Sequence, residues 1–147
     1  MAELVASRVG VVTGHAMPEA LDGLEPIDGA VSCRVAPDEL MLVTEPKAVE
    51  RVLGAVSAAL DEADPGGLAI DATDGWSATI LRGDDARIAF SRLSPLELRG
   101  DGFLQGDLLR LPARVIARDR EVLVLVPAMW EAWFRGTATE RCPEISA

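Results

Sequence analysis

His15, Cys33 and Cys142 are the residues whose types most often supply a base, a nucleophile or a soft metal ligand. His15 is the only histidine, and it stands in a glycine-rich segment without a serine, cysteine or carboxylate motif beside it. The two cysteines belong to no CxxC pair. The sequence therefore predicts no catalytic residue and no metal site, and His15 is kept as the candidate base of a site built from distant segments.

Three pairs of adjacent carboxylates are the next candidates for chemistry. They are Asp38-Glu39, Asp61-Glu62 and Asp84-Asp85. Each pair coincides with a predicted turn or helix end, where acidic side chains cap amide groups or face the helix dipole. We interpret the three pairs as structural.

Arg110, Arg114 and Arg118 recur at four-residue steps within a β-prone run. Since side chains alternate along a strand, this spacing would place all three guanidinium groups on one face. Residues 76 to 147 hold equal numbers of acidic and basic residues, whereas residues 16 to 75 hold thirteen acidic and three basic ones. The three arginines are therefore the predicted site of the alternative function, the binding of folate or another anion.

Aromatic residues are scarce, and three of the six fall within one predicted helix: Trp130, Trp133 and Phe134. One interpretation is that they pack this helix onto a sheet. The other is that an indole remains exposed as an anchor for another protein. Trp76, after an Asp-Gly turn, has the same two interpretations. We name these four residues as predicted partner contacts.

Composition limits the class of partner. The chain has 147 residues, a net charge of −10 and a single lysine, Lys47, while 49% of its residues are hydrophobic. A nucleic-acid binder neutralises phosphates with clustered basic residues, so DNA, RNA and anionic membranes are predicted to be poor partners. No apolar run approaches the roughly 18 to 20 residues that span a bilayer. We expect an acidic, cytoplasmic protein.

The pattern along the chain predicts an irregular N-terminal leader over residues 1–29, one domain over residues 30–136 and a tail over residues 137–147. Asp74-Gly75 predicts either a hairpin between its flanking strands or one bent strand. Gly136 is expected to end the last helix. The predicted strands are 30–35, 40–44, 68–73, 76–81, 108–117 and 121–126; the predicted helices are 46–62, 84–94 and 127–136; residues 96–106 are predicted to be a loop.

Helices that recur after pairs of strands favour an α+β fold. We predict two layers, with a mixed or mainly antiparallel sheet and helices packed on one face. A Rossmann-type fold is disfavoured because strict strand–helix alternation and a glycine-rich fingerprint are both missing.

The order of several short motifs resembles that of a known family. The motifs are RVAPDELMLV (34–43), DATDGW (71–76), LRGDDA (81–86), LSPLEL (93–98), Phe103 with Gly106, and VLVP (124–127) before a tryptophan-bearing helix. In this order and spacing, residues 30 to 134 resemble the gamma subunit of heterotetrameric sarcosine oxidase, which is itself similar to the folate-binding aminomethyltransferase (glycine-cleavage T protein) superfamily.

The resemblance implies an aminomethyltransferase-like domain and an accessory, non-catalytic subunit of a flavin-dependent oxidase or dehydrogenase for N-methylated amino acids. It implies that this chain binds no cofactor, and that larger flavoprotein subunits hold FAD, FMN, NAD and tetrahydrofolate. Folate-using relatives carry an acidic residue after the glycine loop, but residues 114–118 contain no carboxylate. A stand-alone folate- or anion-binding protein is the alternative.

Overall fold

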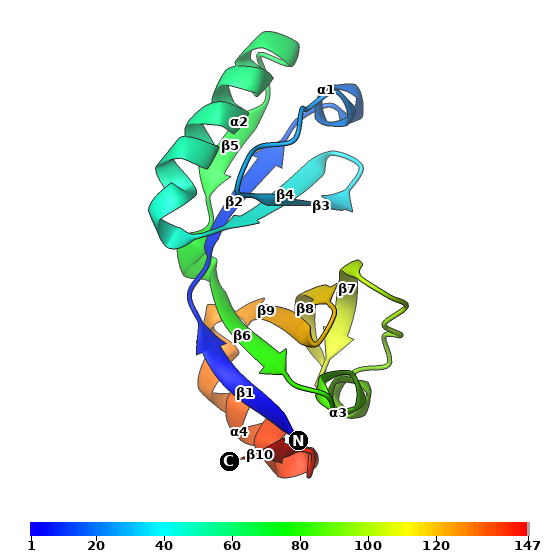
Figure 1. The fold of residues 1–147 in the computed structure, drawn as a ribbon. Coiled ribbons are helices and arrows are strands. Elements are labelled where there is room, and N and C mark those ends of the chain that lie inside the picture. The colour runs from blue at the N-terminus through cyan, green and yellow to red at the C-terminus, as the bar shows by residue number, and fades with distance from the viewer. Residues whose placement is uncertain (147) are drawn as a thin grey trace. The chain divides into compact units, whose positions relative to one another are not determined.

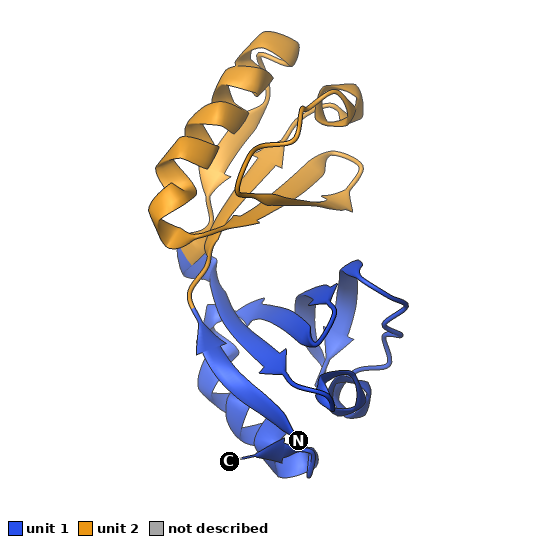
Figure 2. Ribbon diagram, in the orientation of Figure 1, with its two compact units in different colours: residues 1–7, 74–147 blue, residues 8–73 orange. Residues whose placement is uncertain are grey.

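A computed structural model describes residues 1–146, which form two compact units (Figures 1 and 2). Unit 1 combines residues 1–7 with residues 74–147, and unit 2 consists of residues 8–73. The first strand of the chain thus belongs to the same unit as the C-terminal half. The predicted division into a leader, one domain over residues 30–136 and a tail differs from these two units.

Unit 1 is built on a six-stranded mixed sheet of order β10-β1-β6-β9-β8-β7. Every neighbouring pair is antiparallel except β1 and β10, which are parallel. The strands are β1 (Ala2–Ser7), β6 (Trp76–Arg82), β7 (Gly102–Leu108), β8 (Leu111–Arg118), β9 (Glu121–Pro127) and β10 (Ile145–Ser146).

One face of this sheet is covered by α3 (Ala86–Leu93) and α4 (Glu131–Arg141), and the short 3-10 helix η3 (Ala128–Trp130) joins β9 to α4. The core here joins the alternating apolar residues of the strands to Phe90 of α3 and Phe134 of α4, both fully buried. Burial of such aromatic side chains contributes a few kcal/mol each, roughly in proportion to the apolar area removed from water. This core fixes both helices on the sheet.

Unit 2 has a four-stranded antiparallel sheet of order β3-β4-β2-β5. One face of the long helix α2 is apolar at three- and four-residue steps, and Val52, Val56 and Leu60 from it are buried against Val12 and Leu42 of the sheet. The strands are β2 (Gly10–His15), β3 (Val31–Ala36), β4 (Glu39–Thr44) and β5 (Leu68–Asp71); the helices are α1 (Pro18–Asp22), α2 (Val49–Ala63) and the 3-10 turn η1 (Pro46–Ala48). A further 3-10 turn, η2 (Thr73–Gly75), begins at the last residue of unit 2 and continues into unit 1.

The predicted α+β class is confirmed, with mixed and antiparallel sheets and helices packed against them. The β3–β4 and β8–β9 hairpins are where the apolar runs and turn residues predict them. The helix over residues 46–62 is also present, as η1 followed by α2, and Pro46 opens it. These elements are correctly predicted because their signals are local in sequence.

The expectation of an irregular leader over residues 1–29 is wrong. Residues 2–7 form β1, which pairs with β6, and residues 10–15 form β2, which pairs with both β4 and β5. The backbone hydrogen bonds of these strands come from partners more than 20 residues away in sequence. Short strands whose partners are distant in sequence carry little local signal.

Three other expectations differ from the structure. Asp74-Gly75 closes no hairpin, because β5 and β6 belong to different sheets. The predicted loop over residues 96–106 contains the start of β7, an edge strand whose partner is β8. Gly136 does not end α4, since the buried pair Phe134 and Ala138 holds the helix to the core on both sides of it.

Residues 137–146 of the predicted tail are ordered by packing, and residue 147 lies outside the described residues. Cys142 is fully buried, and its thiol lies 3.5 Å from the carbonyl oxygen of Ala89 in α3. Burial raises the pKa of this thiol. The following residues form β10 beside β1. A frayed tail was expected because the segment after Gly136 is short and polar.

Candidate interaction surface

Three large apolar side chains of unit 1 are exposed where η3 passes into α4. Met129 is 84% exposed, Trp130 43% and Trp133 46%. The rings of Trp130 and Trp133 meet edge to face, with centroids 6.1 Å apart and an interplanar angle of 76°. The three residues are called the tryptophan surface below. Exposed indoles that already support each other are suited to bind a partner, because little side-chain freedom is lost on contact.

Phe134 does not belong to this surface. It is fully buried in the core of unit 1, so its prediction as a partner contact is wrong. Trp133 and Phe134 are adjacent in α4, so their side chains leave different faces of the helix. Trp130 precedes α4 and belongs to the 3-10 helix η3, so the α-helical spacing does not apply to it. Only one side of α4 faces the sheet, and Phe134 with Ala138 occupies it.

Trp76 lies at the start of β6 and pairs with Pro127, the residue directly before η3. The guanidinium carbon of Arg114 in β8 lies 5.3 Å from the centre of the Trp76 ring. Trp76 is only partly exposed. The pairing of β6 with β9 therefore places the backbone of Trp76 beside the start of η3, which carries part of the tryptophan surface.

Arg114 also has an unusual polar environment. Its Nε atom is buried, and no residue among 1–146 accepts a hydrogen bond from it. A buried donor without a partner costs about 1–3 kcal/mol. The cation–π contact with Trp76 offsets part of this cost, since such contacts are worth about 0.5–2 kcal/mol.

The other two predicted anion ligands are not grouped with Arg114. Arg110 lies in the turn between β7 and β8 with φ of 66°, outside the strand, so the predicted common strand face does not include it. Arg118 ends β8, four residues from Arg114, and four residues of strand span roughly 13 Å. The structure does not bring the three guanidinium groups together.

Arg118 instead lines a depression of about 740 Å³ with charged walls. Four charged residues of alternating sign stand opposite one another on successive strands: Glu3, Arg82, Glu121 and Arg118. The Nε atom of Arg82 is 2.7 Å from Oε1 of Glu121. Sequence reasoning missed this row, and only knowledge of the strand order could have found it. Its charges balance one another, which disfavours it as a strong anion site.

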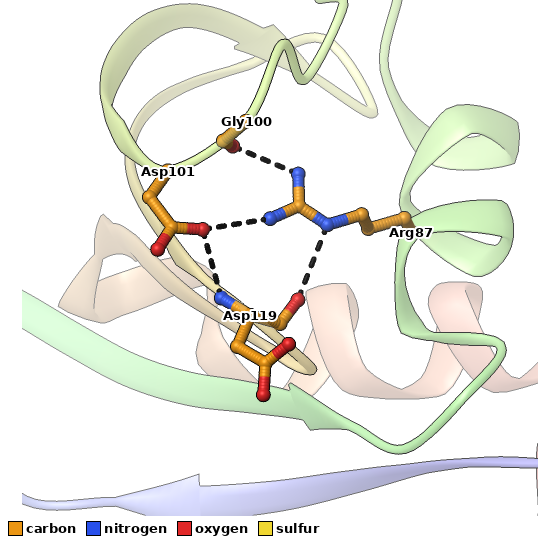
Figure 3. Close-up of polar contacts among 4 residues, drawn as sticks. All are labelled: Arg87, Gly100, Asp101 and Asp119. Carbon is orange, nitrogen blue, oxygen red and sulfur yellow. Dashed lines mark hydrogen bonds and ion pairs between the residues drawn. The ribbon is translucent and has the colours of Figure 1, made fainter.

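The β8–β9 turn is held by Arg87 of α3 (Figure 3). The guanidinium donates to the carbonyl oxygens of Asp119 and Gly100, at 3.2 and 2.9 Å, and pairs with Oδ1 of Asp101 at 3.2 Å. The same carboxylate oxygen accepts the main-chain N–H of Asp119 at 2.8 Å. All three guanidinium nitrogens of Arg87 bond within the cluster, so we interpret it as a structural clamp.

His15 ends β2 in unit 2, where its Nε2 atom is 4.0 Å from Oε1 of Glu39 on β4. No other contact of its side chain is found among residues 1–146. Cys33 is buried in β3. Within the described residues, no three histidine, cysteine, aspartate or glutamate side chains are placed to share a metal ion, and none of the helices is long and apolar enough to cross a bilayer.

No protein-family model matches the sequence, and no curated protein matches it either. Solved structures do match the fold. A chain of the heterotetrameric sarcosine oxidase from Corynebacterium sp. U-96, solved in complex with pyrrole 2-carboxylate, aligns over 95% of this chain and 84% of its own length, with a TM-score of 0.75 and 16% identity.

Two further structures show the same arrangement. The glycine cleavage system aminomethyltransferase T from Bartonella henselae aligns over 99% of this chain with a TM-score of 0.73 and 12% identity, and this chain spans only 47% of it. The ligand-free regulatory subunit of aspartate kinase from Thermus thermophilus aligns over 94% of this chain and 96% of its own, with a TM-score of 0.56 and 10% identity. The chain therefore has an aminomethyltransferase-like α+β fold.

Proposed function

We propose that this chain is an accessory subunit, of the sarcosine oxidase gamma type, in a heteromeric flavin-dependent enzyme that oxidises N-methylated amino acids. The observation that carries the proposal is the match to a chain of comparable length in a heterotetrameric oxidase, of which 84% is covered. The aminomethyltransferase is about twice as long as this chain, so the oxidase chain is the better guide to a separate small subunit.

The tryptophan surface supports an assembly role. Two indoles and a methionine in water are costly for a free protein, and residues of these types dominate the energy of many protein interfaces. We assign Trp130 and Trp133 as the central contacts. Trp76, whose strand pairs with the residue before η3, is assigned as a flanking contact. The expected partners are the larger flavoprotein subunits, which would hold FAD, FMN, NAD and tetrahydrofolate in the cytoplasm.

Isolation of the tagged chain from its source cell tests this proposal. We expect larger chains to co-purify in fixed stoichiometry and the pool to have the yellow visible spectrum of a bound flavin. Mass identification of those chains would establish which subunits they are. A stable monomer without flavin, from cells that express the flavoprotein genes, would contradict the proposal.

The alternative is a stand-alone protein that binds folate or another anion through its arginines. The observation in its favour is the buried, unpartnered Nε of Arg114 beside an aromatic ring. The separation of Arg110 and Arg118 from that position weighs against it. Titration of the isolated chain with tetrahydrofolate, followed by tryptophan fluorescence, separates the two functions, because the accessory role predicts no saturable change.

A further inference from the structure

Unit 2 carries a groove that the proposed function does not use. It has a volume of about 460 Å³ and runs between α2 and the segment formed by α1 and residues 23–27. Four apolar side chains form its floor, with Leu24 and Ile27 on one side and Ala55 and Ala59 of α2 on the other. Leu24 and Ile27 also pack on the core of unit 2, so the floor has firm support.

The α2 wall is built from small side chains. Ala55, Ala59 and Ala63 follow one another at four-residue steps, so they lie on one face of the helix, beside the apolar face that packs on the sheet. Ala55 and Ala63 are exposed. Because alanine side chains are short, the backbone of another helix could approach α2 closely here.

The rim of the groove is negative and uncompensated. Glu19, Glu25 and Glu62 line it, and none of their side-chain carboxylates has an ion-pair or hydrogen-bond partner among residues 1–146. Two neighbouring carboxylates do have polar partners. Asp22 pairs with Arg34, and Asp64 accepts the N–H groups of Met17 and Gly66. Unit 2 as a whole has twelve acidic and four basic residues. Its field therefore favours a cation at this rim.

We propose that this groove binds a basic amphipathic helix of a partner protein, with apolar side chains on the alanine and leucine floor and Lys or Arg at the three glutamates. An amphipathic helix in an apolar groove is a recurring mode of recognition, and charges at the rim set its orientation and its rate of association. A second copy of this chain is a poor occupant, because its net charge of −10 would repel the negative rim. The inference holds whether or not the larger subunits are flavoproteins.

A designed peptide tests the groove on the isolated full chain. The probe is a fluorescent 18-residue helix of leucine on one face and lysine on the other, about five turns long. The control probe carries glutamate in place of lysine. We expect saturable binding of the lysine peptide, measured by fluorescence anisotropy, and no binding of the glutamate peptide. Equal binding of both probes, or of neither, would overturn the proposal.

Two variants locate the site. The triple change Glu19→Gln, Glu25→Gln and Glu62→Gln should weaken binding of the lysine peptide by about tenfold or more, because three rim charges are lost. The matched control is Asp38→Asn, Glu50→Gln and Glu140→Gln, which removes the same net charge from exposed carboxylates outside the groove. It should change the affinity by less than about twofold at moderate salt. Equal weakening by both triples would mean attraction by net charge alone.

The variant Ala59→Phe distinguishes binding of a helix inside the groove from electrostatic attraction of any polycation to the rim. The ring would fill the floor while leaving all three glutamates in place, so peptide binding should be lost and spermine binding should not change. The circular dichroism spectrum should stay that of the parent protein, since Ala59 lies at the surface side of α2. Unchanged peptide affinity in this variant would overturn the proposal even if the glutamate triple weakened binding.

Discussion

At the scale of single residues, this protein is held together by side chains whose partners are distant in sequence. Arg87 links α3 to the loop at residues 100–101 and to the β8–β9 turn, using all of its guanidinium nitrogens. Two of these contacts are to main-chain carbonyl oxygens, so they depend on a planar group with several donors. Lysine has a single ammonium and cannot reproduce this geometry.

Replacement of Arg87 tests the clamp. Arg87→Ala should lower the free energy of unfolding by about 1–2 kcal/mol, and Arg87→Lys should recover only part of that loss. Urea denaturation measures both. Arg99→Ala is the matched control, because the Arg99–Glu97 pair is largely exposed at 81% and 71% and should contribute almost nothing. Equal effects of Arg87→Ala and Arg99→Ala would rule out the clamp.

Glu144 gives the fold a predictable response to acid. A hydrogen bond from its own main-chain amide and the ion pair with Arg92, at 2.6 Å, hold the pKa of its carboxyl below the usual value. A group whose pKa is lower in the folded protein stabilises it above the unfolded pKa, and this contribution is lost as the pH falls through the folded pKa. Glu144 ties the C-terminal segment to α3, so acid should loosen this contact.

The measurement is unfolding by urea at a series of pH values. The free energy of unfolding should fall as the pH drops below the ordinary glutamate pKa of 4.5 toward the lower pKa of the folded state, and the fall should be smaller in Glu144→Gln, which has no proton to bind. At neutral pH this variant should be less stable than the parent protein. An unchanged pH profile in Glu144→Gln would show that the Arg92 contact is not linked to stability.

At the scale of elements, strand β2 and the start of α2 are packed as closely as the backbone allows. A Cβ atom at Gly10 would overlap Cγ2 of Val49 and lie 3.2 Å from the carbonyl oxygen of Glu45. Gly10 itself is buried and pairs with Thr44 of β4. Because residue 10 has no side chain, Val49 at the start of α2 can pack directly on the backbone of β2.

Gly10→Ala should lower the free energy of unfolding by about 1–3 kcal/mol, because strand and helix must separate to admit the methyl group. Gly54→Ala is the opposite case, since nothing lies within 4 Å of a Cβ at this exposed position of α2. It should stabilise the protein by about 0.5–1 kcal/mol through helix propensity. Thermal unfolding distinguishes the two directions, and stabilisation by both would refute the close contact.

Elements with local signals could be predicted from the sequence, and elements that depend on distant pairing could not. The spacing of Val52, Val56 and Leu60 identifies α2 without any knowledge of the sheet. In contrast, β1 becomes a strand because β6 and β10 flank it, and β7 because β8 does. Residue type left two interpretations open for Trp130 and Trp133, packing onto the sheet or exposure, and it gave no sign of Met129. The burial of Phe134 follows from how α4 packs on the core.

At the scale of the whole molecule, the two units differ in charge. Unit 1 holds twelve acidic and ten basic residues, while unit 2 holds twelve acidic and four basic ones. Unit 1 carries the tryptophan surface and unit 2 the acid-rimmed groove. Apolar burial and charge attraction respond oppositely to salt, so contacts made by the tryptophan surface should persist at high ionic strength.

The central claim, assembly through the tryptophan surface, is tested most directly by isolating Trp130→Ser/Trp133→Ser from the source cell and measuring the amount of flavoprotein that remains bound. Hot-spot indoles are each worth about 2 kcal/mol or more, which is about thirtyfold in affinity per indole, so the double variant should retain less than about a hundredth of the affinity. Ile88→Ser, which removes an apolar side chain that is 51% exposed on α3, should retain full binding. Equal recovery of flavoprotein with both variants would contradict the account.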